Sequence, residues 1–480
     1  MRVSGRRSYR SYGSAVLGFA ALLALGFFML WDGSAPAFFS LGPRDDMRFM
    51  AVSTCQQGAI AAMVLAAPFA TGFMKRRATL MFGLACSVLL VVPIVLQCWL
   101  VGVRWHEAAT AACALAFGAG TGGCYVLWVM VFASFGRRAA IKVVGLASAA
   151  FPLVYLCFAL LLPKEALPFV ALGLALTSSG ILIARVRSLN YGKGLFRRAP
   201  HGLRRNAALV DAGFAKAVTC VALLGIASVL ARHVAIGEAA LAEWVVTVSV
   251  AGAMAVAVLF LAVDAASKSQ KSYYERIPQV YQVLYLLVAA GFVLLPFLGL
   301  RYRLVLAGLT YSVFTLASLL MMVASIEAAM KLKMHPMFAY CVFAGVVYSA
   351  TCLGAAFGSA VKLLDGSGPA LSFAALAVLY VLSLALVFPR KEGRPAVADA
   401  DEVSDALREK CRLAAETSGL SSREAEVMEL LARGRDLPYI AELLCISKST
   451  VQSHGKRIYR KMGVHSKQEL ITKIEGMASL

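Results

Sequence analysis

The segment 448–461 concentrates residues that can bind nucleic acid, with five Lys or Arg residues and no acidic residue. Lys and Arg bind phosphate groups, while Ser, Thr and Gln form hydrogen bonds with base edges. A helix turns by about 100° per residue, so Val451, Ile458 and Met462 fall on one apolar stripe and leave polar side chains outside. Such a helix suits the major groove of DNA. The predicted DNA contacts are Lys448, Ser449, Thr450, Gln452, Ser453, His454, Lys456, Arg457, Arg460 and Lys461.

Neighbouring helices are predicted to hold this one in place. Ser421 and Glu424 match a capping box, in which each side chain binds the other residue's backbone N–H at the start of a helix. A second, short helix follows near Asp436, and Ser447 is placed to cap the helix at 448–462. The predicted core of this helix-turn-helix consists of Ile440, Ala441, Leu444, Ile446, Val451 and Ile458.

These residues resemble a known family. Leu420-Ser-x-Arg-Glu-x-Glu-Val427, Ile446-Ser447-x-x-Thr450-Val451-x-x-His454 and Lys461-Met-Gly-Val464 are similar to the LuxR/GerE-type DNA-binding domain. The resemblance implies a four-helix domain, with its last helix at about 467–477, that binds two-fold related half-sites as a dimer. It makes Gln468, Ile471 and Thr472 the candidate dimer contacts. Two departures from the family, at Asp436-Leu-Pro-Tyr439 and at Gln452, leave the fold intact, and the second bears on operator preference.

The rest of the chain has the composition of a membrane protein. Of its 480 residues 60% are hydrophobic and 15% charged, and the mean hydropathy is +0.75. A helix of about 20 apolar residues crosses the hydrocarbon core. About twelve such runs predict an all-α, polytopic domain, and the first run is interpreted as a retained helix. The predicted spans are 14–31, 49–73, 78–100, 108–135, 139–162, 166–184, 214–234, 241–263, 279–299, 304–328, 337–361 and 369–388.

The charges predict the orientation of these spans. The formal net charge is +21, and the loops that alternate along the chain divide their Lys and Arg residues 25 to eight. Positive residues favour the cytoplasmic side. Both termini are therefore predicted in the cytoplasm, and the chain is predicted to be a multi-pass protein of the inner membrane.

The order of apolar and polar segments along the chain predicts three parts. They are a membrane sensor domain at 1–388, a linker and connector helix at 389–416, and the DNA-binding domain at 417–480. Two groups of six helices around a long basic loop resemble the major facilitator superfamily in layout. The segment 402–416 is open to three interpretations: a connector helix, a dimer contact through Val403, Leu407 and Ala414, or a solvated helix.

Other patterns receive plainer interpretations. Gly118-x-Gly120-x-x-Gly123 lies inside an apolar helix, which favours close helix packing over dinucleotide binding. Glu327 is assigned to anchoring at the membrane interface. Gln56, Gln57 and Gln97 either line a ligand cavity or form hydrogen bonds within helices. We predict no catalytic residues, metal or cofactor, and no enzymatic activity.

The sequence thus predicts a one-component transcriptional regulator. Its membrane domain would sense a small molecule or a membrane state, and its cytoplasmic domain would bind promoter DNA as a homodimer. The expected partners are promoter DNA, the lipid bilayer and an unidentified small-molecule ligand, and RNA polymerase is a candidate partner. Two alternatives are a transporter with an appended DNA-binding domain and a membrane scaffold that binds protein.

Overall fold

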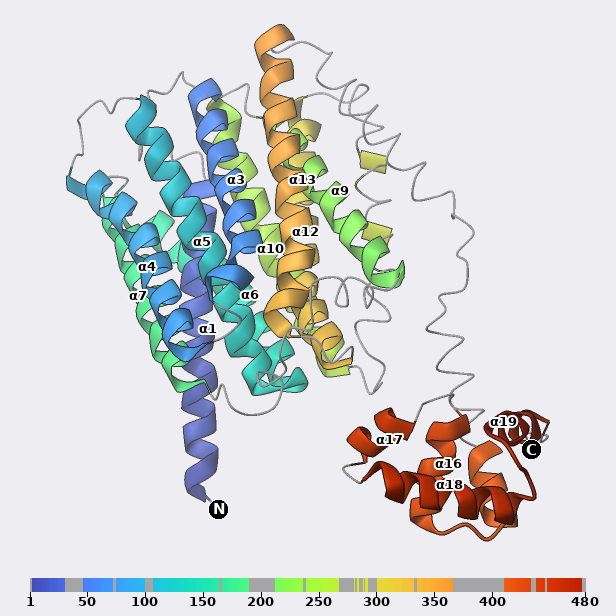
Figure 1. Cartoon of the computed structure of the whole chain (residues 1–480). Helices are drawn as coiled ribbons and strands as arrows, with labels where there is room; N and C mark the ends of the chain where they lie inside the picture. Colours follow the sequence, from blue (N-terminus) through green and yellow to red (C-terminus); the bar gives the residue numbers. More distant parts are fainter. Residues whose placement is uncertain are drawn as a thin grey trace. The chain divides into compact units, whose positions relative to one another are not determined.

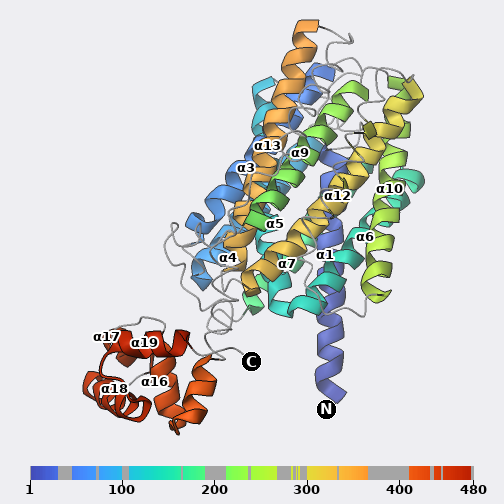
Figure 2. The ribbon, with the colours of Figure 1, turned by 90° about the vertical axis from the view of Figure 1, so that its right-hand side faces the viewer.

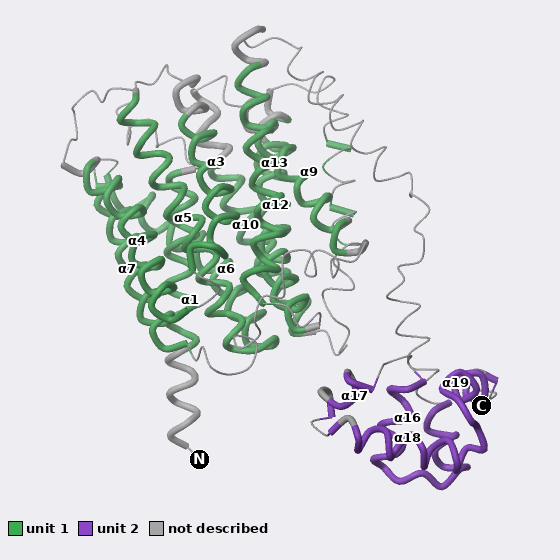
Figure 3. The backbone as a smooth tube through the Cα atoms, in the orientation of Figure 1, with its two compact units in different colours: residues 1–389 green, residues 390–480 purple. Residues whose placement is uncertain are grey.

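The computed structural model divides the chain into two compact units, residues 1–389 and residues 390–480 (Figure 3). The regular elements of the described residues are helices, as the sequence predicts. The structure describes residues 2–30, 46–71, 75–99, 107–163, 166–189, 212–235, 239–266, 280, 283–284, 288, 290–291, 300–331, 335–365, 410–432, 437–444 and 447–476.

The first unit is a bundle of long helices (Figure 1). Nine of those described are long and apolar enough to cross a membrane, and α9 carries a shorter apolar segment, Ala217–Leu230. The helices are α1 (Arg2–Leu30), α3 (Asp46–Ala70), α4 (Arg76–Trp99), α5 (Glu107–Phe135), α6 (Arg137–Leu161), α7 (Leu167–Ser188), α9 (Ala212–Ala235), α10 (Ala239–Ala266), α12 (Leu300–Lys331) and α13 (Pro336–Asp365).

Most of the predicted spans coincide with these helices. The helices from α1 to α10 correspond to the first eight predictions, and α12 and α13 to those at 304–328 and 337–361. The predicted span 369–388 lies outside the described residues, as does 279–299 except for a few helical positions between 280 and 291. The total of twelve spans therefore stays a prediction.

The helices before and after the basic segment 190–211 form two groups that pack together. Within the first group, α1 packs against α6 and α7, and α5 against α3 and α4. Within the second, α12 packs against α9, α10 and α13. The groups meet where α3 contacts α13 and α6 contacts α10, as the two views in Figures 1 and 2 show.

The glycine pattern of α5 serves close helix packing. A Cβ atom added at Gly118 would lie 2.4 Å from the Gln56 carbonyl oxygen on α3. One added at Gly120 would lie 2.6 Å from the Leu90 backbone nitrogen on α4. The backbones on both sides of α5 leave no room for side chains there, which confirms the packing interpretation and gives the pattern no role in dinucleotide binding.

Glu327 differs from its prediction as a membrane-interface anchor. Its side chain is only 4% exposed, and its Oε1 accepts a hydrogen bond of 2.6 Å from Arg137 Nε. A buried carboxylate needs a partner because it has lost its water. The ion pair joins α12 to the first residue of α6, and so links the two groups of helices.

The second unit is a small helical domain with its own core. Its helices are a segment over residues 410–417, α16 (Ser422–Ala432), α17 (Leu437–Leu443), α18 (Lys448–Met462) and α19 (Lys467–Glu475). Cys411, Ala414 and Ala415 are buried in the core of this domain. The interpretation of this region as a solvated helix is therefore wrong for that face, which packs inward. Val403 and Leu407 lie outside the described residues.

Candidate nucleic-acid interface

Helix α18 has the predicted bounds, because both of its ends are defined by local chemistry. The Ser447 hydroxyl accepts a hydrogen bond of 3.0 Å from the Thr450 backbone N–H, as an N-cap residue does. Gly463 ends the helix with φ of 63°, a left-handed conformation that favours glycine. Its N–H donates to the carbonyl groups of Tyr459 and Arg460.

The two faces of α18 have opposite character. Val451 and Ile458 are fully buried and Met462 nearly so, which confirms the predicted apolar stripe. Ile440 of α17 is also fully buried, while Ala441 and Leu444 are half-buried against the same core. Predicted core residue Ile446 lies outside the described residues.

The predicted DNA contacts lie mostly on the outward face of α18. His454 is half-buried, and its Nδ1 has no hydrogen-bond partner within the described part of the chain. The Lys448 side chain lies outside the described residues. The side chains that are exposed to solvent are Ser449, Thr450, Gln452, Ser453, Lys456, Arg457, Arg460 and Lys461.

Lys461 also has a role within the domain that the sequence did not indicate. Its Nζ donates hydrogen bonds to Glu424 Oε2 at 2.8 Å and to the Gly419 carbonyl oxygen at 3.0 Å. The ammonium group therefore ties the C-terminal end of α18 to the start of α16. Its assignment as a DNA contact stays a prediction. Lys456, Arg457 and Arg460 are also exposed.

Glu424 is the centre of this contact. The Ser421 backbone N–H donates to its Oε2 at 2.9 Å, and the Glu424 N–H donates to the Ser421 hydroxyl at 3.3 Å, which confirms the predicted capping box. Hydrogen bonds from Lys461 and Ser421 stabilise the carboxylate and lower the pKa of Glu424 from 4.5 to about 2. The side chain is thus ionised at neutral pH.

Two further cations bind backbone carbonyl groups at helix ends. Arg423 Nη2 donates to the Leu444 carbonyl oxygen at 2.8 Å, where α17 ends. Lys473 Nζ donates to the Met462 carbonyl oxygen at 2.6 Å, where α18 ends. In each contact the cation and the carbonyl group lie on different helical segments, 21 and 11 residues apart, so no local pattern in the sequence indicates them. The first contact joins α16 to the end of α17, and the second joins α19 to the end of α18.

Helix α19 also has two faces. Leu470 and Ile474 are fully buried, while Gln468 and Thr472 are exposed and Ile471 is half-buried. The Thr472 hydroxyl donates to the Gln468 carbonyl oxygen at 3.0 Å, within its own helix. Gln468, Ile471 and Thr472 stay predicted dimer contacts.

Comparisons with known proteins agree with this geometry. Residues 418–474 match the family described as bacterial regulatory proteins, luxR family. The chain is 42% identical over 52 residues to an uncharacterised response regulatory protein, YgeK, of Escherichia coli, which is 11% of this chain and 35% of that protein. It is 44% identical over 52 residues to the oxygen regulatory protein NreC of Staphylococcus aureus, 11% of this chain and 24% of that protein. The C-terminal unit therefore carries a LuxR-type helix-turn-helix domain.

A third similar protein is the probable transcriptional regulatory protein NarL of Mycobacterium tuberculosis, 47% identical over 45 residues, or 9% of this chain and 21% of that protein. The chain thus spans about a third or less of the length of these relatives. A solved structure, the human organic anion transporter MFSD10 (TETRAN), aligns with 79% of this chain and 99% of its own, at 17% identity and a TM-score of 0.46. A likeness this low assigns neither fold nor activity.

Proposed function

We propose that the chain is a membrane-bound, one-component transcriptional regulator that binds promoter DNA through the outward face of α18. One observation carries this proposal: α18 exposes polar and cationic side chains along one face, contains no acidic residue, and is fixed by a buried stripe on the other. The first turns would contact base edges, with Gln452 as the best-placed reader. Lys456, Arg457 and Arg460 would bind phosphates.

Dimerisation through α19 completes the proposed DNA-binding unit. Two copies joined through Gln468, Ile471 and Thr472 would present two α18 helices to two-fold related half-sites. Both faces of the domain would then be occupied, with α18 on DNA and α19 on the second copy.

The first unit is proposed to be the sensor. The nine candidate spans found among its described residues support a multi-pass membrane protein. The 25-to-eight division of Lys and Arg supports an inner-membrane orientation with both termini in the cytoplasm. A ligand would act by binding more tightly to one of two states of this unit. Reporter fusions after Lys75, Arg198 and Lys391 should report the cytoplasm, and fusions after Asp45 and Gly366 the outside. An external signal at Lys391 would contradict the proposal.

DNA binding is tested on the fragment 402–480, which includes the helix at 410–417 and the whole core of the second unit. We expect it to shift fragments of the neighbouring promoter, with an affinity that falls steeply as salt rises, because phosphate contacts release counterions. Gln452→Ala should change the ranking of operator variants, since Gln pairs with adenine, and each such pair discriminates by about 1–3 kcal/mol. An equal loss on every sequence would show that Gln452 does not read bases.

Sensing is tested by separating the two units. The fragment 402–480, forced to dimerise by a fused zipper, should regulate its promoter whatever inducer is present. The full chain should respond to inducer only with its first unit intact. If the soluble dimer follows inducer in cells without the full chain, sensing lies elsewhere.

The alternative function is a transporter whose appended domain regulates transcription. The observation in its favour is a cavity between the two groups of helices, since such a site can bind a substrate. It predicts protein-dependent flux of the bound compound into proteoliposomes. A sensor without transport activity gives none.

A further inference from the structure

The first unit contains a cavity of about 160 Å³ between its two groups of helices. Its walls come from α1, α3, α5 and α6 of the first group and from α9, α12 and α13 of the second. A molecule bound there would touch both groups at once. The cavity is therefore placed where binding can favour one arrangement of the groups over another.

The lining of this cavity is uncharged and strongly aromatic. The 24 lining residues among those that the structure describes include eight Phe or Tyr residues and no Asp, Glu, Lys, Arg or His. A charged ligand would lose its water there without finding a counter-charge, which is costly. Flat, apolar walls instead favour a ligand that is itself planar and apolar over most of its surface.

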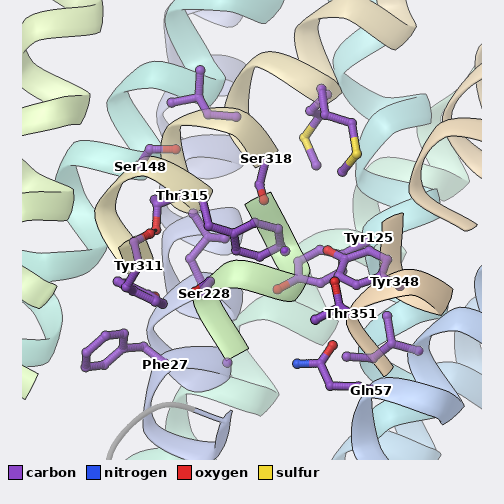
Figure 4. Close-up of a pocket in the computed structure, with 18 of the residues that line it drawn as sticks. Phe27, Gln57, Tyr125, Ser148, Ser228, Tyr311, Thr315, Ser318, Tyr348 and Thr351 are labelled. Atoms are coloured by element: carbon purple, nitrogen blue, oxygen red, sulfur yellow. Dashed lines mark hydrogen bonds between the residues drawn. The ribbon is translucent and has the colours of Figure 1, made fainter. Parts of the chain in front are cut away.

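The aromatic side chains form two walls. The rings of Tyr125 and Tyr348 stack with centroids 6.3 Å apart and an interplanar angle of 1°. The rings of Phe27 and Tyr311 meet edge to face at 5.3 Å. Figure 4 shows the stacked tyrosines on one side of the cavity and Phe27 with Tyr311 on the other. These parallel and edge-on faces match the ways in which an aromatic ring packs on others.

Among the described lining residues, one buried polar atom lacks a hydrogen-bond partner. The Gln57 Oε1 atom is buried and has no hydrogen-bond partner within the described residues. A buried carbonyl oxygen without a donor is unfavourable, so a ligand that supplies a hydroxyl or N–H gains by satisfying it. By contrast, the hydroxyls of Thr315 and Thr351 already donate to carbonyl groups of their own helices, at 2.9 and 2.8 Å.

We propose that this cavity binds an uncharged, planar aromatic molecule with one hydrogen-bond donor. The Gln57 side-chain oxygen accepts the hydrogen bond from this donor. This inference deepens the proposed sensor function, because it names the chemical class of the ligand. It also decides between the two interpretations of the glutamines: Gln57 lines the cavity, and Gln56 does not. The side chain of Gln97 lies outside the described residues.

Gln56 supplies a matched control. It is the neighbour of Gln57, its side chain is fully buried, and neither its Oε1 nor its Nε2 has a partner within the described residues. It is absent from the cavity lining, and its backbone carbonyl faces Gly118 of α5. Replacing either glutamine by Leu removes the same chemical group from α3, but only Gln57→Leu changes the cavity.

The test is equilibrium binding to the full chain, purified in detergent, with three naphthalene probes of similar shape. They are 2-naphthol, which is neutral and a donor, 2-naphthoate, which is an anion, and 2-(aminomethyl)naphthalene, which is a cation at pH 7. We expect saturable binding of 2-naphthol at one site per chain, and at least about tenfold weaker binding of both charged probes. Gln57→Leu should weaken 2-naphthol binding about tenfold, as loss of one buried hydrogen bond does, and Gln56→Leu should leave it unchanged.

Two outcomes would overturn the inference: a charged probe that binds as tightly as 2-naphthol, or 2-naphthol binding that Gln57→Leu and Gln56→Leu affect equally. Thermal unfolding without probe shows whether each variant is folded. If Gln57→Leu does not fold, Ser228→Leu, which fills the cavity from α9, should abolish binding of 2-naphthol, and retained binding then overturns the inference. Promoter activity is measured separately, since a probe that binds without changing transcription contradicts the sensor function and leaves the cavity assignment intact.

Discussion

The two units use serine and threonine hydroxyls in partly different ways because they face different solvents. In the first unit, the hydroxyls of Thr121, Ser312 and Ser325 each donate to the carbonyl four residues earlier in their own helix, at 2.8 Å. In the second, Ser421, Ser447 and Ser466 accept backbone N–H groups at helix starts. A hydroxyl in an apolar helix has no water to bond and is satisfied by a carbonyl group of its own helix, as Thr472 also is in the second unit. In water a serine hydroxyl can in addition cap the start of a helix.

The apolar surfaces differ in the same way. The large hydrophobic side chains that are exposed among the described residues all belong to the first unit, and Leu160, Leu161 and Leu353 are among the most exposed. In the second unit the apolar residues of α18 and α19 lie mainly on the face that packs inward, and Ile471 of α19 is half-buried on the other face. One unit is apolar inside and out, and the other is apolar only inside, which is what lipid and water respectively require.

Packing of the first unit should break at α5. Gly120→Val places side-chain atoms against the α4 backbone, which cannot move aside as a flexible side chain can. We expect a loss of about 3 kcal/mol or more, beyond the usual 1–3 kcal/mol of overpacking. Thermal unfolding of the detergent-purified chain measures it. Gly180→Val is the control, because nothing lies within 4 Å of a Cβ atom at Gly180. Equal effects would show that helix propensity, and not close packing, matters.

Packing of the second unit should break at the helix over 410–417. Ala414 is fully buried, so Ala414→Asp places a charge in an apolar core, and we expect a loss on the order of 3 kcal/mol. Urea unfolding of the fragment 402–480 measures it. Arg412→Ala, at a side chain 59% exposed, should change stability by less than about 0.5 kcal/mol. If Ala414→Asp leaves the stability of the fragment unchanged, this helix does not pack in the core.

The outward face of α18 should be needed for DNA binding and not for folding. Lys456→Ala with Arg457→Ala removes two predicted phosphate contacts. The negative slope of log affinity against log salt concentration should therefore become less steep by about 1.8. Gel shifts of the fragment 402–480 across a salt series measure this slope, and the unfolding midpoint should stay the same. Arg412→Ala removes a cation away from α18 and should leave the slope unchanged. If the variant loses stability in parallel with DNA binding, the outward face of α18 is also needed for folding, and the prediction is wrong.

The smallest expected effect concerns the Glu424 contact. Glu424→Gln should destabilise the fragment 402–480 by about 1 kcal/mol at pH 7, because the ion pair with the 35% exposed Lys461 is partly solvated. The pKa of Glu424 is lowered from 4.5 to about 2, so its contribution is complete above pH 4.5 and is lost as the pH falls toward 2. Urea unfolding at several pH values should show the two proteins converging there. Glu416→Gln, at an exposed pair, should show no such convergence.

The sequence by itself determined the elements whose signals are local. The start of α18 follows from Ser447, its apolar stripe from the helical period, and the start of α16 from the capping box of Ser421 and Glu424. Most membrane helices follow from the length of apolar runs. Each of these signals is carried by residues within one or two turns, so they act before any tertiary contact forms.

Only the tertiary structure decided which side chains meet across helices. From the sequence, Lys461 is one more cation on the predicted DNA-binding face. In the structure it forms an ion pair with Glu424 of α16. Nothing local distinguishes Gln57 from Gln56 in an apolar helix, yet one lines a cavity and the other lies outside its lining. Glu327 needed Arg137 from another helix to be buried at all. In a helix that is apolar on every side, periodicity cannot show which face is inward, because lipid and core accept the same side chains.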